Sequence, residues 1–256
     1  SGGHASAPEA PGYCVLICQP HERFEAEVKA LRTLRNNQVA GVLMSHAIGS
    51  DNGDHILEVL GDRIPLVQFD RVFSELPGAK VVSNNFEGAY AATKHLVEQG
   101  YRRIGTLAGY MNSEAYAARL EGYRQALRDS GLPVDESLVH YDTIVRETGF
   151  EAGLKAIDAG CDALYSAGDF SALGAIEAAR ERGLRIPEDF GIVGTANEAF
   201  TALMTPSMSS LALNPFEMGR QAAQAFLAGE EGTVVVPMEL KVRESSCRNK
   251  QQNLSI

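Results

Sequence analysis

The sequence predicts an α/β fold with two doubly wound, Rossmann-like parallel sheets and a ligand cleft between the two lobes. Apolar strand-like runs alternate with amphipathic helices of 10 to 15 residues, which is the pattern of parallel sheets. About ten predicted strands are too many for one compact sheet of ordinary size. The 256 residues, 45% hydrophobic and 22% charged, suit two lobes that each bury a core.

The first half of the chain contains strands and one-sided helices in turn. Apolar residues at helical spacing, such as Val28 and Leu31, predict the first helix. Asn84 and Asn85 are suited to cap a later helix, and Gly100 to end it. The predicted elements are a strand at 12–18, a helix at 22–37, a strand at 39–45, a helix at 54–61, strands at 64–69 and 81–83, a helix at 86–100 and a strand at 103–108.

The second half continues the alternation. Gly131 and Pro133 end one predicted helix, and Gly183 ends another. The predicted elements are a helix at 116–130, a strand at 138–141, a helix at 148–159, a strand at 163–166, a helix at 170–182 and a strand at 190–194. We expect a hinge near Gly109 and a ligand at the carboxyl ends of the strands.

Charge and cysteine usage restrict the partners. The 33 acidic residues outnumber the 23 basic ones, so the net charge of -10 repels nucleic acid and this chain should not bind DNA by itself. No apolar run reaches the roughly 18 residues of a membrane span, and residues 1–11 lack the features of a signal peptide, so we expect a cytoplasmic protein without a membrane partner. Cys14 and Cys18 share one face of an apolar strand-like run, which predicts buried thiols rather than a metal pair.

Sequence motifs for catalysis are missing. Neither the dinucleotide-binding glycine motif, the P-loop nor G-x-S-x-G occurs, and the six histidines lack the spacing of metal ligands. The sequence therefore predicts no enzyme activity, no cofactor and no metal site. Asp70, Asp142 and Asp169 follow strands or turns but belong to different crossovers, and helix capping stays open as an explanation for the last two.

Several polar residues occupy positions where a cleft needs hydrogen-bond donors and acceptors. These candidate ligand-binding residues are Arg71, Asn84, Asn85, Arg119, Asp169 and Asn197. Arg119 lies beside the apolar face of its helix, where its guanidinium could hold two hydroxyls or a carboxylate. An exposed surface arginine is the alternative interpretation of that position.

Residues 39–246 resemble the effector-binding core of LacI/GalR-type transcriptional repressors, whose fold is shared with periplasmic sugar-binding proteins. The ending ELKVRESS is more similar to the repressors than to the exported binding proteins, which favours regulation over transport. The segments that carry the resemblance are IPLVQFDR at 64–71, NNFEGAYAATKHLVEQGYRRIGTLAG at 84–109, RLEGYRQALRDSGLP at 119–133, ALGAIEAARERGLRIPEDFGIVG at 172–194, NPFEMGRQAAQAFLAG at 214–229 and PMELKVRESS at 237–246.

The resemblance implies a periplasmic binding protein type I-like architecture. The N-terminal lobe would contain residues 12–108 and 215–229, and the C-terminal lobe residues 109–213 and 235–247. Residues 1–11 would be disordered or a cloning remnant, and residues 248–256 a tail. The expected partners are a small sugar-like or related effector, a second copy of the chain, and operator DNA only through a helix-turn-helix headpiece that does not precede residue 12. Effector binding would control that headpiece allosterically.

The same resemblance assigns roles to candidate residues. Arg119 matches the family arginine that binds ligand hydroxyls, Asp169 matches the second residue of an N-D-x-x-A-L-G stretch, and Asn84–Asn85 replaces a pair with acidic character. Gly168, Ala196 and Leu213 stand where the family has polar ligand contacts; their absence weakens binding of a family-typical sugar, so we expect an effector other than a simple free hexose.

Two other functions stay open at the level of the sequence. A solute-binding receptor for transport would share the fold but would have a signal peptide upstream and be a monomer. A doubly wound enzyme acting on a sugar or nucleotide would need clustered ionisable groups in the cleft, and the missing motifs argue against it.

Overall fold

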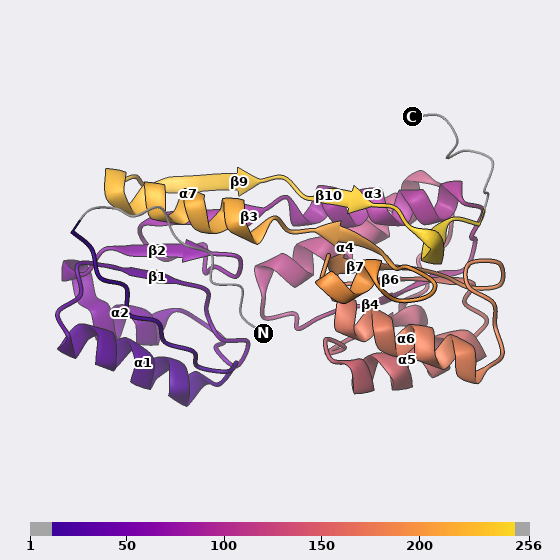
Figure 1. The fold of residues 1–256 in the computed structure, drawn as a ribbon, viewed down its shortest axis with the longest axis horizontal. Coiled ribbons are helices and arrows are strands. Elements are labelled where there is room, and N and C mark those ends of the chain that lie inside the picture. The colour runs from indigo at the N-terminus through magenta and orange to yellow at the C-terminus, as the bar shows by residue number, and fades with distance from the viewer. Residues whose placement is uncertain (1–11, 249–256) are drawn as a thin grey trace. The chain divides into compact units, whose positions relative to one another are not determined.

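The computed structural model describes residues 12–248, which form two compact units (Figure 1). Of the described residues, the first unit contains those up to Ser83, the segment Asn112–Ala115 and the segment Asn214–Val236. The second unit contains Asn84–Met111, Tyr116–Leu213 and the residues from Pro237 onward. The predictions for residues 1–11 and for most of the tail lie outside the described residues.

The first unit is built on a parallel sheet of order β1-β2-β3-β9. Leu31 and Ile56 pack two helices against one face of this sheet, and Ala222 packs a third helix against the other face (Figure 1). The strands are β1 (Val42–Met44), β2 (Leu66–Phe69), β3 (Ala79–Ser83) and β9 (Gly232–Val236), and the helices are α1 (Phe24–Asn36), α2 (Asp54–Leu60) and α7 (Pro215–Ala228).

The second unit is built on a sheet of order β10-β8-β7-β6-β4-β5, parallel except for β10. Leu96 and Tyr123 fill the core on one face, and Ile176 and Phe190 fill the core on the other. The strands are β4 (Ile104–Leu107), β5 (Val139–His140), β6 (Ala163–Ser166), β7 (Gly191–Ala196), β8 (Ser209–Ala212) and β10 (Glu239–Lys241), and the helices are α3 (Asn85–Glu98), α4 (Glu114–Asp129), α5 (Arg146–Asp158) and α6 (Asp169–Glu181). The predicted α/β class with two doubly wound parallel sheets is confirmed.

The boundary between the units differs from the one expected at residue 108. Strand β4 pairs with β5 and β6, so the strand predicted at 103–108 belongs to the second unit together with α3 before it. At the other end, β9 pairs with β3 in the first unit, whereas β10 pairs with β8 in the second. Hydrogen-bonded pairing decides the unit to which each strand belongs, and local periodicity does not reveal that pairing.

The strand predicted at 12–18 is absent from the described structure, and the prediction that its thiols are buried is wrong. Cys14 and Cys18 are both exposed, and the side chain of Ile17 is 88% exposed. No described strand pairs with this segment; the ring of Tyr13 packs edge-on against Phe226 of α7, with 6.0 Å between ring centroids. An apolar run becomes a buried strand only when neighbouring strands and helices cover it.

Among residues 12–248 no helix combines the length and the apolar character that crossing a lipid bilayer requires.

Candidate functional site

Arg119 is buried in the second unit and is bound on two sides. It lies on α4, is 5% exposed, and donates from Nε to Oδ1 of Asn85 at 2.8 Å and from Nη1 to the carbonyl oxygen of Ala167 at 3.0 Å. Its guanidinium also lies 5.2 Å from the ring centre of Tyr116. The interpretation as an exposed surface arginine is therefore wrong, and Nη2 remains as the nitrogen without a hydrogen bond to the described residues.

Asp169 is the first residue of α6 and is 2% exposed. Its Oδ1 accepts from the hydroxyl of Ser210 at 2.7 Å, and its Oδ2 accepts from the backbone N–H of Glu198 at 2.8 Å. Burial raises the pKa of Asp169, although these two hydrogen bonds oppose the rise. Each carboxylate oxygen of Asp169 thus accepts one hydrogen bond from within the second unit.

Asn197 follows β7 and is joined to Asp169 through one hydroxyl. Its backbone N–H donates to Oγ of Ser210 at 3.0 Å, and Ser210 in turn donates to Asp169. The side-chain oxygen of Asn197 accepts from Nη2 of Arg243 at 2.7 Å. Asn197 has a left-handed backbone with φ of 55°, a conformation that asparagine tolerates better than most residues.

Asn84 and Asn85 have different tasks although they are adjacent. Asn85 is 8% exposed and accepts from Arg119, whereas Asn84 is the N-cap residue of α3. The side chain of Asn84 does not cap the helix; its Oδ1 accepts from the backbone N–H of Met238 at 2.7 Å. The predicted N-cap position is confirmed, but the side chain of Asn84 binds the backbone of Met238 instead of the first turn of α3.

Arg71 belongs to the first unit and follows β2 after a left-handed Asp70 with φ of 61°. Its Nη2 donates to Oε1 of Glu22 at 3.0 Å, and its backbone N–H donates to the hydroxyl of Ser45 at 3.4 Å. The other carboxylate oxygen of Glu22 accepts from the backbone N–H of Ile48 at 3.0 Å. Glu22 thus links Arg71 to the loop after β1.

The structure brings five of the six predicted residues into one unit and leaves Arg71 in the other. Arg119 binds the residue after β6, Asp169 begins the helix after β6, and Asn197 follows β7, so three candidates meet at the carboxyl ends of adjacent strands, as expected for a doubly wound sheet. Sequence reasoning missed the residues that orient them, above all Ser210, Arg243 and Glu22. No local motif marks these three, because each acts across more than 40 residues of chain.

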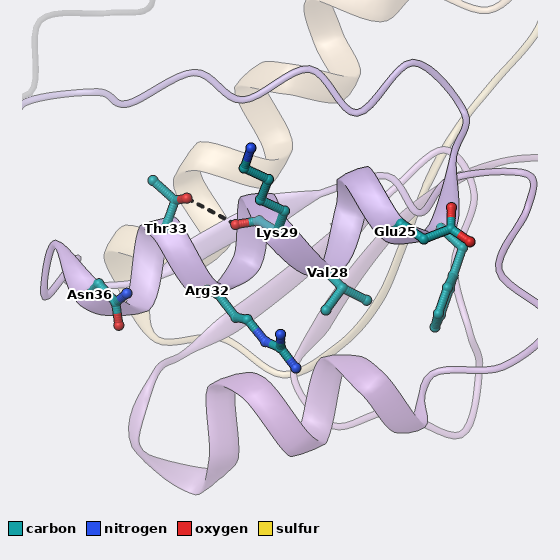
Figure 2. Close-up of a pocket in the computed structure, with 7 residues that line it drawn as sticks. Glu25, Val28, Lys29, Arg32, Thr33 and Asn36 are labelled. Atoms are coloured by element: carbon teal, nitrogen blue, oxygen red, sulfur yellow. Dashed lines mark hydrogen bonds between the residues drawn. The ribbon is translucent and has the colours of Figure 1, made fainter.

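A pocket of about 460 Å³ lies on the outer side of α1 and contains none of the predicted residues (Figure 2). Val28, Lys29 and Arg32 line it, and Thr33 donates to the carbonyl oxygen of Lys29 at 2.9 Å on its rim. That bond is the ordinary contact of a threonine with the preceding helical turn. The pocket runs along the exposed face of one helix, where Phe24 and Val28 lie beside charged side chains, and it gives no support to a second ligand site.

Comparison with protein families and curated proteins identifies relatives of one kind. Residues 93–246 match the family model described as a periplasmic binding protein-like domain. The chain is 30% identical over 243 residues to the HTH-type transcriptional regulator DegA of Bacillus subtilis, with 92% of this chain and 72% of that protein covered. It is 30% identical over 219 residues to the HTH-type transcriptional repressor PurR of Actinobacillus pleuropneumoniae. That match covers 84% of this chain and only 64% of the length of PurR.

Solved structures agree with these relatives. The transcriptional regulator CelR in its cellobiose complex superimposes with a TM-score of 0.78 at 30% identity, covering 87% of this chain and 71% of that one. A LacI family transcriptional regulator from Enterococcus faecium with bound ribose gives a TM-score of 0.76 at 25% identity, covering 87% and 85%. On the family match, the 30% identity over 92% of the chain and the matching fold, the chain belongs to the LacI family of transcriptional regulators.

Proposed function

We propose that this chain is the effector-sensing domain of a LacI-type transcriptional regulator. A small sugar-like or related metabolite would bind at the carboxyl ends of the strands and control DNA binding by a headpiece outside this chain. The observation that carries the proposal is that the guanidinium of Arg119 is fixed in place but has a donor to spare. Its Nε and Nη1 donate to Asn85 and Ala167, while Nη2 has no hydrogen bond to the described residues and can donate to a ligand. A donor held rigidly at the edge of a sheet suits ligand hydroxyls.

The kinship supports this role. Similar proteins are named as transcriptional regulators, and two of the similar structures hold cellobiose and ribose. We extend from them to this chain a carbohydrate-related effector, a homodimeric state, action in the cytoplasm and the lack of enzyme activity. Sedimentation of the purified chain tests the dimer; a species at monomer mass over the micromolar range would contradict it.

Ligand screening tests the sensing role directly. Differential scanning fluorimetry with neutral sugars, sugar acids, sugar phosphates and nucleobases should reveal a compound that raises the melting temperature. In Arg119→Lys that shift should be lost, because lysine cannot present the same planar set of donors. Arg124→Lys, at a partly exposed position on the same helix, is the matched control and should keep the shift. A shift retained in Arg119→Lys would contradict the assignment of Arg119.

The regulatory part needs the complete polypeptide with its DNA-binding region. The effector found above should change the affinity for operator DNA by about 5- to 150-fold, the usual range of allosteric coupling. A gel-shift titration with and without the effector measures this change. An affinity unaffected by saturating effector would refute regulation and favour a receptor or an enzyme.

A further inference from the structure

The loop between β7 and β8 is bound at three points by one arginine, Arg243. Its Nη2 donates to Oδ1 of Asn197 at 2.7 Å, and its Nη1 donates to the carbonyl oxygen of Met208 at 2.8 Å. Nη1 also donates to Oγ1 of Thr201 over a longer distance, 3.4 Å. These acceptors come from the start, the end and the middle of the loop 197–208, so a single planar guanidinium constrains the shape of the whole loop.

The backbone of Arg243 is itself fixed by buried serines. Its N–H donates to Oγ of Ser209 at 2.7 Å. The N–H of Ser209 donates to Oγ of Ser245 at 2.9 Å, and the hydroxyl of Ser245 donates to the carbonyl oxygen of Ile192 in β7 at 2.7 Å. Both serines are buried. The guanidinium therefore reaches the loop from a rigid base, which is what a side chain needs in order to position other groups.

The segment that Arg243 binds begins with a strained turn. Ala196 has a φ of 126° and Asn197 a φ of 55°, so two consecutive residues other than glycine have positive φ. Such a backbone is uncommon and persists only where the surrounding structure holds it. The hydrogen bond from Arg243 to the side chain of Asn197 is one of the contacts that hold this turn.

The same turn supplies the donors that orient Asp169. The N–H of Glu198 donates directly to Oδ2 of Asp169 at 2.8 Å. The N–H of Asn197 donates to Oγ of Ser210 at 3.0 Å, and the hydroxyl of Ser210 donates to Oδ1 of Asp169 at 2.7 Å. Two consecutive N–H groups thus fix the carboxylate, one directly and one through a hydroxyl. A turn that shifted would withdraw both.

We propose that Arg243 is a positioning residue for effector binding, because it fixes the turn at Asn197 and Glu198 and through that turn orients the carboxylate of Asp169. The inference rests on the proposed function, in which Asp169 is a candidate ligand-binding residue. It adds a new segment to the effector site. Arg243 follows β10, whereas all the candidate ligand-binding residues of the second unit precede β8.

Carbon-13 NMR of the aspartate carboxyl groups tests the inference without any ligand. In the native chain burial raises the pKa of Asp169, and the hydrogen bonds from Ser210 and Glu198 oppose that rise. Arg243→Lys keeps the positive charge and loses the planar set of donors. The turn should then withdraw its donors, and the pKa of Asp169 should rise further. The resonance is assigned by its absence from the spectrum of Asp169→Asn.

Two further variants calibrate and control this measurement. Ser210→Ala deletes one donor to Asp169 and shows how far one lost hydrogen bond raises its pKa; Arg243→Lys should produce a comparable rise. Arg180→Lys is the matched control, because exposed Arg180 donates to the carbonyl oxygen of Thr205 in the same loop. It should leave the pKa of Asp169 unchanged.

A second route to the same readout covers the case in which Arg243→Lys does not fold. Asn197→Gly removes the acceptor of Arg243 while glycine still accepts the left-handed backbone. Because the turn then loses its side-chain anchor, the pKa of Asp169 should rise in this variant as well.

Effector affinity is the second measurement, made by isothermal titration calorimetry. The probe is the compound that gives the largest melting-temperature shift in the screen of sugars, sugar acids, sugar phosphates and nucleobases. It should bind Arg243→Lys about tenfold or more weakly than the native chain, the loss expected for one misplaced hydrogen bond. Arg180→Lys should bind it as the native chain does.

Two results would overturn the inference. One is an unchanged pKa of Asp169 in folded Arg243→Lys, even if that variant melts earlier, since Arg243 would then only stabilise the fold. The other is an affinity of Arg243→Lys equal to that of the native chain. A screen that reveals no ligand would instead refute the proposed function, and the NMR titration would still decide whether Arg243 positions Asp169.

Discussion

Replacing Arg119 by methionine should destabilise the second unit far more than the same change at Arg124, one and a half turns later on α4. Methionine is similar in length and fills the volume, so the comparison isolates the charge and the hydrogen bonds. Arg119 is 5% exposed and bonded to Asn85 and Ala167, whereas the side chain of Arg124 is 22% exposed and paired with Glu136, itself 55% exposed.

The magnitude follows from those partners. Two hydrogen bonds from a charged donor contribute about 1.5 to 3 kcal/mol each. Removing the cation also removes the cost of keeping it away from water, which offsets part of the loss. We therefore expect Arg119→Met to lower the free energy of unfolding by about 2 to 4 kcal/mol. The exposed pair of Arg124 is worth about 1 kcal/mol or less, and that contribution should shrink in salt.

Urea unfolding followed by far-ultraviolet circular dichroism measures both variants, because the chain has no tryptophan to serve as a fluorescent probe. The shift in transition midpoint at an unchanged slope gives the change in stability. Equal losses for Arg119→Met and Arg124→Met, within about 0.5 kcal/mol, would refute the view that Arg119 is held by a buried hydrogen-bond network.

Three further predictions concern packing, pH and thiol reactivity. A Cβ on Gly174 would lie 2.0 Å from the carbonyl oxygen of Arg146, so Gly174→Ala should separate α5 from α6 and lower the free energy of unfolding by about 3 kcal/mol or more. A Cβ on Gly219 in α7 would meet nothing within 4 Å, so Gly219→Ala should raise that free energy by about 0.5 to 1 kcal/mol, measured by the same urea unfolding. Burial lowers the pKa of His95 below the ordinary value of a histidine, about 6.5, so the folded state binds this proton less readily than the unfolded state does. The stability of the fold should therefore decrease as the pH drops below about 6.5, and His95→Gln should flatten that slope; an unchanged slope would contradict the prediction. The exposed Cys14 should react with a thiol reagent in the native protein, whereas Cys161, which is buried and whose thiol pKa burial raises to about 12, should react only on unfolding.

The fold could be predicted largely from periodicity, whereas the partners of individual strands could not. Helices such as α4 and α6 begin and end close to their predicted limits because apolar spacing, caps and glycine stops are local signals. The assignment of β4 to the second sheet was not predictable in this way, since it depends on pairing with β5 and β6. The apolar run at 12–18 has the composition of a strand and lacks a described partner, so composition alone misled.

The candidate site shows the same division. Position after a strand or at a helix start selected Arg119, Asp169 and Asn197, because the carboxyl edge of a parallel sheet is the place where such side chains meet. The hydrogen bonds that these side chains make were not predictable from the sequence. Ser210 donates to Asp169 and Arg243 donates to Asn197, and both donors come from distant parts of the chain.

The sequence by itself determined the α/β class, the acidic balance of the chain and the residue types at the edge of each sheet, because these depend on composition and local periodicity. The family followed from the resemblance of whole segments of the sequence. Tertiary structure alone decided which of these groups keep unused hydrogen-bonding capacity. Each oxygen of Asp169 accepts a hydrogen bond within the second unit, while Arg119 and Arg71 each retain a donor without a described acceptor. The physical reason is that hydrogen-bond satisfaction depends on which distant segments the fold brings within about 3 Å, a property of packing and not of neighbours along the chain.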